Sequence, residues 1–285
     1  MTGPYESPMR RPSARANRTP IIIAAIFILF LLGLWHSRDN LPEQPLHYIQ
    51  GIGSTTASTS TRPSFYEIAM KHGTDKVRPH NYQYMYEPRL APMRDQKLKM
   101  LEIGLGCDMS YGPGASYYTW LEYFPNVDLY YIEYDAACAA AWANQTTDAT
   151  IYTGDQADVT FLQQFIVQSG GDFDIIIDDG GHTMNQQRVS LDILWEVVKP
   201  GGIYFIEDLD TSYLSQYGGG LGRTDTFMED IKHILDDLNK HPGVPDKTRI
   251  SRDVIKLDFA QEIVALTKRN LRLGNDGRVG YSWET

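Results

Sequence analysis

The sequence predicts an α/β fold, a Rossmann-like and mostly parallel sheet of seven strands that ends in an antiparallel hairpin. One observation is that apolar runs of strand length alternate with segments of helical length, as they do in βαβ units. Another is that acidic residues close three of these runs, at Glu102, at Asp178 and Asp179, and at Glu207 and Asp208. Ligands of open α/β sheets bind at the carboxyl ends of parallel strands. We therefore expect a cofactor site and a reaction site at these ends.

The expected elements follow one another along the chain without a visible internal repeat. A helix over residues 65–72 comes first. Strands are predicted at residues 99–103, 129–133, 150–153, 173–177 and 203–207, and further helices at residues 117–124, 136–144, 159–168, 185–198 and 227–239. A short polar stretch separates two last strands, at residues 254–258 and 263–267, which favours an antiparallel hairpin.

Length, charge and cysteine content limit the class of protein. A chain of 285 residues has room for one domain of about 200 to 250 residues and an extension. Its net charge of −10 argues against binding to a phosphate backbone, so no nucleic acid partner is expected. Cys107 and Cys138 are the only cysteines, and neither has the paired spacing of a zinc site. The two could lie near each other above the first two strands, but we expect two reduced thiols.

The first 63 residues differ in composition from the rest. Four arginines precede an uncharged apolar run of 15 residues, and a Ser/Thr-rich stretch follows it. This order predicts a cytosolic basic arm (residues 1–20), a single-pass transmembrane signal-anchor helix (21–36), a flexible stalk (37–63) and the folded domain (64–285). The run is shorter than the roughly 20 residues that span a bilayer, and a cleaved signal peptide is the alternative. The expectation is a membrane partner and an endomembrane location, with the N-terminus in the cytosol.

The turn after the first strand is rich in glycine. Gly104 and Gly106 let the backbone approach a ligand closely, because a side chain would block that approach. Glu133 ends the second strand, where an acidic side chain can accept both hydroxyls of a ribose. The next glycine, Gly112, comes too late for the dinucleotide pattern Gly-x-Gly-x-x-Gly, so a nicotinamide cofactor is not favoured.

Further candidates for the cofactor site end the neighbouring strands. Asp155 and Gln156 follow the third strand, where a carboxylate and an amide could bind an adenine edge. A helix cap is the alternative for Asp155. Glu102 and Asp178, which close the first and fourth strands, complete the cofactor-binding candidates.

The acidic residues at the ends of two neighbouring strands predict a metal site. Asp179, Glu207 and Asp208 would repel one another, so a fold that gathers them needs a cation or a proton. Carboxylate oxygens are the ligands that Mg²⁺ prefers. His182 lies three residues past Asp179 and can exchange a proton near neutral pH, which predicts a general base. The alternative is that the carboxylates cap helices and His182 begins one.

Two segments have the mix of aromatic residues and glycines expected of a substrate rim and lid, residues 81–86 and 213–222. Ordinary surface loops with packed tyrosines are the alternative. A small natural product or a modified peptide would suit such a rim as acceptor.

Other classes of protein fit the pattern less well. A metal-dependent oxygenase would need a second histidine, and His72, His80, His233 and His241 are expected away from the strand ends. A serine hydrolase would need a Gly-x-Ser-x-Gly elbow, which the sequence lacks. A membrane-tethered binding protein without catalysis stays open. Such a protein is expected to have a broken acidic cluster, whereas the cluster of this sequence is intact.

The motifs together resemble a known family, the S-adenosylmethionine-dependent methyltransferases of the macrolide sugar type, and among them the metal-dependent mycinamicin and macrocin O-methyltransferases. The similarity lies in HGTDK, LEIGLG, YYIEYD, GDQAD, DIIIDDGGH and PGGIYFIEDLDTSY, in this order along residues 65–269. The predicted anchor and the loop at residues 107–114 depart from the family pattern.

The resemblance implies a class I methyltransferase fold with S-adenosylmethionine and Mg²⁺ as cofactors. By similarity, the cofactor would be held by Glu102, Gly104, Glu133, Asp155 and Gln156, the Mg²⁺ by Asp179, Glu207 and Asp208, and the acceptor proton would go to His182. Mg²⁺ assists the deprotonation of a hydroxyl more than that of an amine. We therefore expect O-methylation of a small natural product, with N-methylation of an amine or a modified peptide as the alternative.

Overall fold

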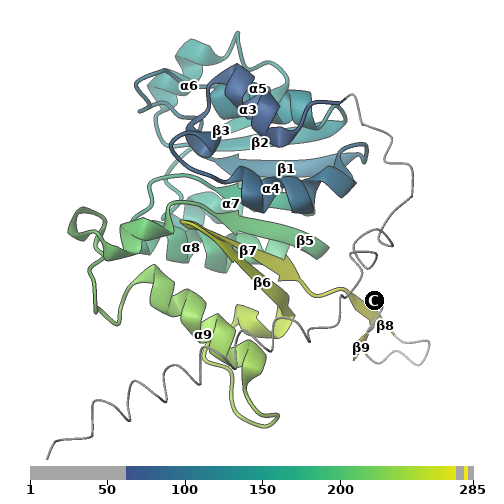
Figure 1. Ribbon diagram of the computed structural model, residues 1–285, viewed down its shortest axis with the longest axis vertical. Helices are drawn as coiled ribbons and strands as arrows, with labels where there is room; N and C mark the ends of the chain where they lie inside the picture. The colour runs from purple at the N-terminus through teal and green to yellow at the C-terminus, as the bar shows by residue number, and fades with distance from the viewer. Residues whose placement is uncertain (1–61, 274–278, 282–285) are drawn as a thin grey trace, which may run out of the picture. The chain divides into compact units, whose positions relative to one another are not determined.

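The computed structural model of the chain describes residues 62–273 and 279–281, and it confirms the predicted fold class. A seven-stranded sheet runs in the order β3-β2-β1-β4-β5-β7-β6 (Figure 1). Its parallel strands are β1 (Leu98–Ile103), β2 (Val127–Glu133), β3 (Ala149–Thr153), β4 (Phe173–Asp178) and β5 (Val198–Ile206). The predicted hairpin is formed by β6 (Val254–Ala260) and β7 (Ile263–Lys268), and β7 pairs antiparallel with β5. A separate two-stranded ladder joins β8 (Leu271–Leu273) and β9 (Val279–Tyr281).

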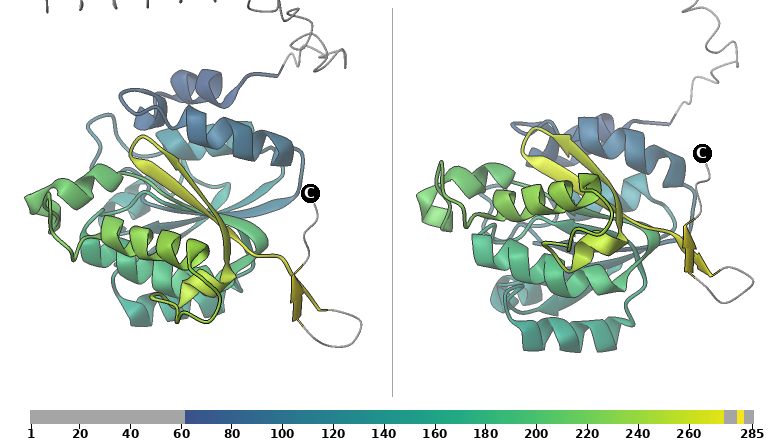
Figure 2. Two further views of the ribbon diagram at one scale, coloured as in Figure 1. Left: turned by 60° about the horizontal axis from the view of Figure 1, so that its bottom comes forward. Right: turned by 90° about the horizontal axis from the view of Figure 1, so that it is seen from below.

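Helices cover both faces of the sheet (Figure 2). They are α3 (Phe65–His72), α4 (Gln83–Leu90), α5 (Ala115–Tyr123), α6 (Ala136–Trp142), α7 (Val159–Ser169), α8 (Met184–Leu194) and α9 (Phe227–Asn239). Capping boxes begin two of them, at Ser64 for α3 and at Thr183 for α8.

Among the helices, two depart most from the prediction. The helix α8 ends four residues early, because a 3-10 turn follows it and Val198 already begins β5. The helix α4 was not predicted, since Pro88 lies inside it and proline is rare in helix interiors. The predicted substrate rim at residues 81–86 overlaps the start of α4, and of its three tyrosines Tyr82 and Tyr86 are buried and only Tyr84 is widely exposed. The segment therefore packs two of its three tyrosines inside the domain.

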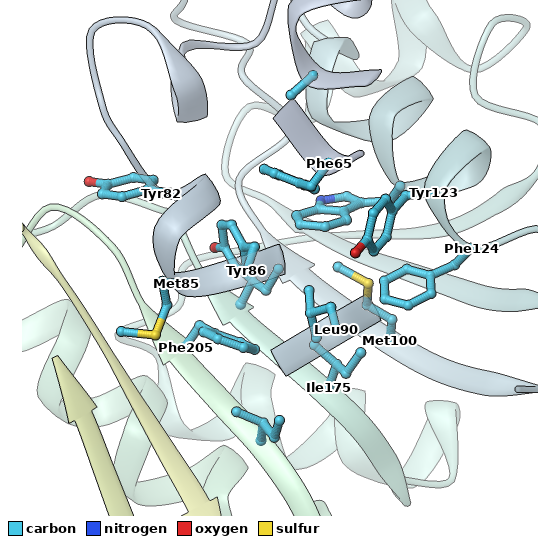
Figure 3. Packing of buried hydrophobic residues seen from close by; sticks show 14 of the residues in the cluster. Phe65, Tyr82, Met85, Tyr86, Leu90, Met100, Tyr123, Phe124, Ile175 and Phe205 are labelled. Carbon is cyan, nitrogen blue, oxygen red and sulfur yellow. The ribbon is translucent and has the colours of Figure 1, made fainter. Parts of the chain in front are cut away.

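Alternation along the strands divides the core into two layers. Ile175, Ile177 and Phe205 pack toward α3, α4 and α5, where Figure 3 shows the ring of Tyr86 beside that of Phe205. Ile176 and Tyr204, on the same strands, pack toward α7, α8 and α9. Successive side chains of a strand point to opposite faces, so a residue at a strand end continues the face set by its position. This alternation determines which acidic side chains at the strand ends lie on the same face of the sheet.

The cysteine prediction is wrong, because Cys107 and Cys138 form a disulfide with a Cα–Cα distance of 6.1 Å. The physical reason is the pairing of β1 with β2, which brings the loop after β1 next to the start of α6. The bond therefore ties the glycine-rich loop to α6.

Reducing this disulfide should destabilise the domain. The bond joins residues 31 apart in sequence, and loop-closure entropy of that size corresponds to about 3.7 kcal/mol of unfolding free energy. Urea unfolding with and without a dithiol reductant measures the effect. The double variant Cys107→Ser, Cys138→Ser should match the reduced protein and should not respond to the reductant. Equal stability of the oxidised and reduced proteins would contradict this account.

The membrane prediction needs correction. The predicted anchor, residues 21–36, lies outside the described residues, as do the basic arm and nearly all of the stalk. In the part of the chain that the structure describes, no helix is both long and apolar enough to cross a bilayer. The apolar run of the sequence is itself shorter than the roughly 20 residues that a span requires. We therefore withdraw the transmembrane helix, the membrane partner and the endomembrane location.

Candidate active site

A cavity of about 410 Å³ opens above the carboxyl ends of β1, β2 and β4. Several predicted site residues line it, namely Gly104, Gly106, Glu133, Gln156, Asp179, His182 and Asp208. The other candidates, Glu102, Asp155, Asp178 and Glu207, are not among its lining residues. The cavity lies at the strand ends where the candidate residues are expected, and the structure separates the candidates that line it from those that lie behind its wall.

Glu133 holds two loops together at one end of the cavity. One carboxylate oxygen accepts a hydrogen bond from the Leu105 backbone N–H at 2.9 Å, and the other accepts from Asp135 N–H at 2.8 Å. Each oxygen keeps a lone pair, so the carboxylate can accept two more hydrogen bonds from a ligand that carries neighbouring hydroxyls.

Gly104 allows the loops after β1 and β4 to approach each other. Its φ is +100°, and a Cβ atom built on it would lie 2.1 Å from the carbonyl oxygen of Asp179. Any larger residue would push these loops apart. The glycine therefore shapes the cavity through a backbone contact within the chain.

Gln156 and Asp178 form a buried polar group beside the cavity. The Gln156 side chain accepts from Gly181 N–H at 2.8 Å and donates to Asp178 Oδ1 at 2.8 Å. The Asp178 carboxylate also accepts from the hydroxyls of Ser190 and Tyr204, so it faces α8 and supports the loop from behind. Asp155 accepts from Ala157 N–H at 2.8 Å, as a turn cap does.

Three acidic side chains meet a buried lysine at the other end of the cavity. Lys76 Nζ lies 3.2 Å from Glu102 Oε1, 2.6 Å from Asp179 Oδ2 and 2.8 Å from Glu207 Oε1. Burial disfavours its charge, but the Asp179, Glu207 and Glu102 carboxylates outweigh this effect and raise the pKa of Lys76 well above its usual value. These three carboxylates form the inner part of the acidic cluster, and the Lys76 ammonium neutralises part of their charge.

Asp208 lies in the outer part of the cluster with His182. Its carboxylate is 3.3 Å from His182 Nε2 and accepts a hydrogen bond of 2.6 Å from the Tyr82 hydroxyl. Asp208 and His182 have φ angles of 54° and 56°, in the left-handed region that residues other than glycine seldom adopt. Such strained residues concentrate at functional sites.

The outer side chains could hold a metal ion. Asp179, His182 and Asp208 each offer a ligand atom, and these atoms lie within 4.8 Å of one another. Two carboxylates in a partly exposed cavity fit Mg²⁺, which binds through few carboxylates and keeps several waters. Glu207, the third predicted ligand, turns both oxygens to Lys76 Nζ, at 2.8 and 2.9 Å.

Asp179 gives the domain a pH-dependent stability. Burial raises the pKa of its carboxyl to about 6, although the Lys76 ammonium opposes the rise. The folded chain then keeps this proton to higher pH than the unfolded chain, so ionisation costs stability as pH rises from about 4 to about 6. In metal-free buffer, the Asp179→Asn variant should gain stability relative to the unchanged chain across this window. Urea unfolding at several pH values measures the difference, and a difference independent of pH would contradict the assignment.

Three residues that complete the site were not predicted, and they lie between α3 and the first turn of α4. Lys76, Tyr82 and Tyr86 all contact the acidic cluster, and Tyr86 donates to Glu207. Their signals were the HGTDK motif and the helical spacing of Tyr82 and Tyr86. The expectation for His80 is also wrong, because its Nε2 lies 3.8 Å from Asp208 Oδ1 and its Nδ1 lies 2.9 Å from Glu262 Oε2.

Comparison with known proteins identifies relatives among tailoring enzymes of natural products. No family model matches the chain. The 8-demethyl-8-(2-methoxy-alpha-L-rhamnosyl)-tetracenomycin-C 3'-O-methyltransferase of Streptomyces olivaceus is 31% identical over 67% of this chain and 50% of its own length. Mycinamicin VI 2''-O-methyltransferase of Micromonospora griseorubida is 30% identical over 72% of this chain and 54% of its own length. The chain thus spans about half the length of the curated relatives it matches.

A solved structure supports the same relation. The MycE methyltransferase from the mycinamycin biosynthetic pathway, in complex with Mg, SAH and mycinamycin VI, matches 74% of this chain and 55% of its own chain, with a TM-score of 0.65 and 27% identity. Fold and comparisons confirm the predicted class, the S-adenosylmethionine-dependent methyltransferases. Within that class, the relatives are O-methyltransferases of the mycinamicin, macrocin and tetracenomycin type, which confirms the resemblance seen in the sequence.

Proposed function

We propose that this chain transfers the methyl group of S-adenosylmethionine to a hydroxyl group of a small natural product. The observation that supports this proposal most is that one cavity joins Glu133 and the glycine-rich loop to Asp179, His182 and Asp208. A cofactor bound beside Glu133 and the glycine-rich loop would point toward His182 and the neighbouring carboxylates, which are suited to removing a proton. The names of the relatives support hydroxyl acceptors rather than amines.

The proposed roles follow from the positions of the side chains. Glu133 would accept hydrogen bonds from the ribose hydroxyls. Gln156 would lie at the adenine end, while Asp155, which does not line the cavity, would cap the turn beside it. Gly104 and Gly106 would let the backbone of their loop approach the cofactor. Asp178 would support the loop after β4 through Gln156, and Glu102 would stay behind the cavity wall, bound to Ser116 and Lys76. The metal ligands would be Asp179 and Asp208, with Glu207 held behind them by Lys76.

His182 would act as the general base. Its Nε2 faces the outer carboxylates, and its Nδ1 is buried without a hydrogen-bond partner among residues 62–273. When bound, S-adenosylmethionine supplies an electrophilic methyl group and Mg²⁺ supplies a positive charge for the acceptor hydroxyl. His182 would take the hydroxyl proton as the new O–CH₃ bond forms and the S–CH₃ bond breaks. Tyr82 would keep Asp208 oriented, since burial and the nearby carboxylates raise the pKa of Tyr82 and keep its hydroxyl a donor.

The acceptor would enter beside the segment after β5. The ring of Tyr217 lies 6.4 Å from that of His182, and Tyr213, Leu214 and Leu221 of the same segment are exposed. This position supports the predicted rim at residues 213–222. An aromatic ring beside the base and exposed apolar side chains in the same segment suit an acceptor with an apolar body and a free hydroxyl.

Methyl transfer from labelled S-adenosylmethionine tests the proposal. Glycosylated polyketides with free sugar hydroxyls serve as acceptors, and their amino-sugar analogues without that hydroxyl serve as matched controls. We expect label on a hydroxyl, located by mass spectrometry. Label on amines alone would favour N-methylation, and no transfer to any acceptor by a protein that binds the cofactor would contradict the proposed acceptor class.

Glu133 should determine cofactor affinity. The Glu133→Gln variant keeps the side-chain size but replaces an acceptor by an amide donor, which leaves a buried backbone N–H without its partner. We expect affinity for S-adenosylmethionine to fall by about 10- to 100-fold, measured by calorimetry. Asp158→Asn, at the cap of α7, is the control and should bind like the unchanged protein. Unchanged affinity of Glu133→Gln would remove Glu133 from the cofactor site.

A further inference from the structure

Lys76 is an ammonium group buried among carboxylates, and it takes no part in the proton transfer proposed above. Its side chain is 1% exposed, and it follows α3 in the short 3-10 helix Asp75–Val77. An ammonium has three N–H donors, and three carboxylates lie within 3.2 Å of Nζ. A buried charge without such partners would be strongly destabilising, so these contacts account for its presence in the core.

The pleat of the sheet explains why these three carboxylates meet. Glu102 continues the face of Met100 on β1, and Glu207 continues the face of Phe205 after β5. Both faces look toward α3 and α4, where Figure 3 shows Tyr82 and Tyr86 on the same side. Lys76, which precedes β1 in the chain, therefore lies on the face of the sheet toward which Glu102 and Glu207 point.

Asp179 is shared between the two parts of the cluster. Its Oδ2 contacts Lys76 Nζ at 2.6 Å, while its Oδ1 points toward His182 Nε2 at 4.0 Å. Glu207 is fully used on the inner side, because both oxygens contact Lys76 and one also accepts from Tyr86. The free oxygens of the outer part therefore belong to Asp179 and Asp208.

We propose that Lys76 is a positioning residue that acts as a built-in cation for the inner part of the acidic cluster. It holds Glu207 away from the cavity and fixes Asp179 with one oxygen facing it, so that the outer part takes up a single divalent ion. The metal part of this inference rests on the proposed function, whereas the ion-pair part does not.

Replacing Lys76 by methionine tests the inference, because methionine keeps the length and removes the charge. In metal-free buffer the melting temperature of Lys76→Met should fall by about 10 °C, as expected for a broken buried ion pair. Mg²⁺ should then raise the melting temperature of the variant by several degrees more than that of the unchanged protein, since it can replace the missing charge. The matched control is Lys99→Met, because Lys99 is partly buried at the other end of β1 and donates to the Ser169 carbonyl. Its loss of stability should not be relieved by Mg²⁺.

The charge-balanced variant Lys76→Met, Glu207→Gln keeps the test independent of the metal. It should recover most of the melting temperature lost in Lys76→Met, and it should fold even if the single variant does not. Failure of this recovery would overturn the role of Lys76. A Lys76→Met protein that folds but gains no more from Mg²⁺ than the Lys99→Met control would overturn the metal part alone.

Discussion

Replacing His182 by alanine should reduce methyl transfer by about 10²- to 10⁴-fold, the usual contribution of a general base. The reason is the position of His182 in the wall of the cavity. Its Nε2 lies 3.3 Å from Asp208, away from Glu133 and the proposed cofactor end. The cofactor contacts proposed here do not involve the imidazole. Affinity for S-adenosylmethionine should therefore stay within about two-fold, measured by calorimetry beside steady-state kinetics.

The control for this variant is His233→Ala, because His233 lies on α9 and does not line the cavity. It should leave turnover unchanged. If His182→Ala lost cofactor affinity and turnover to the same degree, the histidine would be a binding residue and its assignment as base would be wrong.

Replacing Asp208 by asparagine should have the second large effect. Asparagine keeps the size and tolerates the left-handed backbone with φ of 54°, so the variant removes little but the charge. With one of the two outer carboxylates gone, turnover at low Mg²⁺ should fall by at least about 100-fold. Excess Mg²⁺ should restore part of it, and a titration of the metal against the initial rate measures this recovery.

Asp210→Asn is the matched control, since this exposed carboxylate lies two residues further along the chain. It should not change the metal requirement. An Asp208→Asn enzyme with the unchanged requirement for Mg²⁺ would exclude Asp208 as a metal ligand.

The sheet was predictable because its signals are local. Each strand is a short apolar run, and each run ends in polar residues, so the carboxyl ends could be located from the sequence. Even the division between Asp178 and Asp179 follows from strand alternation, since neighbouring residues point to opposite faces. Asp178 accordingly faces Ser190 of α8, and Asp179 faces Lys76.

The rest of the site depends on contacts between distant segments. Lys76 is 103 residues from Asp179 in the sequence, and no local pattern states that α3 and α4 pack over the strand ends. The disulfide was missed for a similar reason, because the distance between Cys107 and Cys138 depends on how two loops leave adjacent strands. The transmembrane prediction relied on composition alone, from a run too short to define a span.

The proposed cofactor is the central claim, and a calorimetric titration of the protein tests it directly. S-adenosylmethionine and its demethylated product are each titrated with and without Mg²⁺, and NAD is the control. We predict saturable binding of both sulfur nucleosides and none of NAD. A folded protein that binds neither sulfur nucleoside would contradict the account.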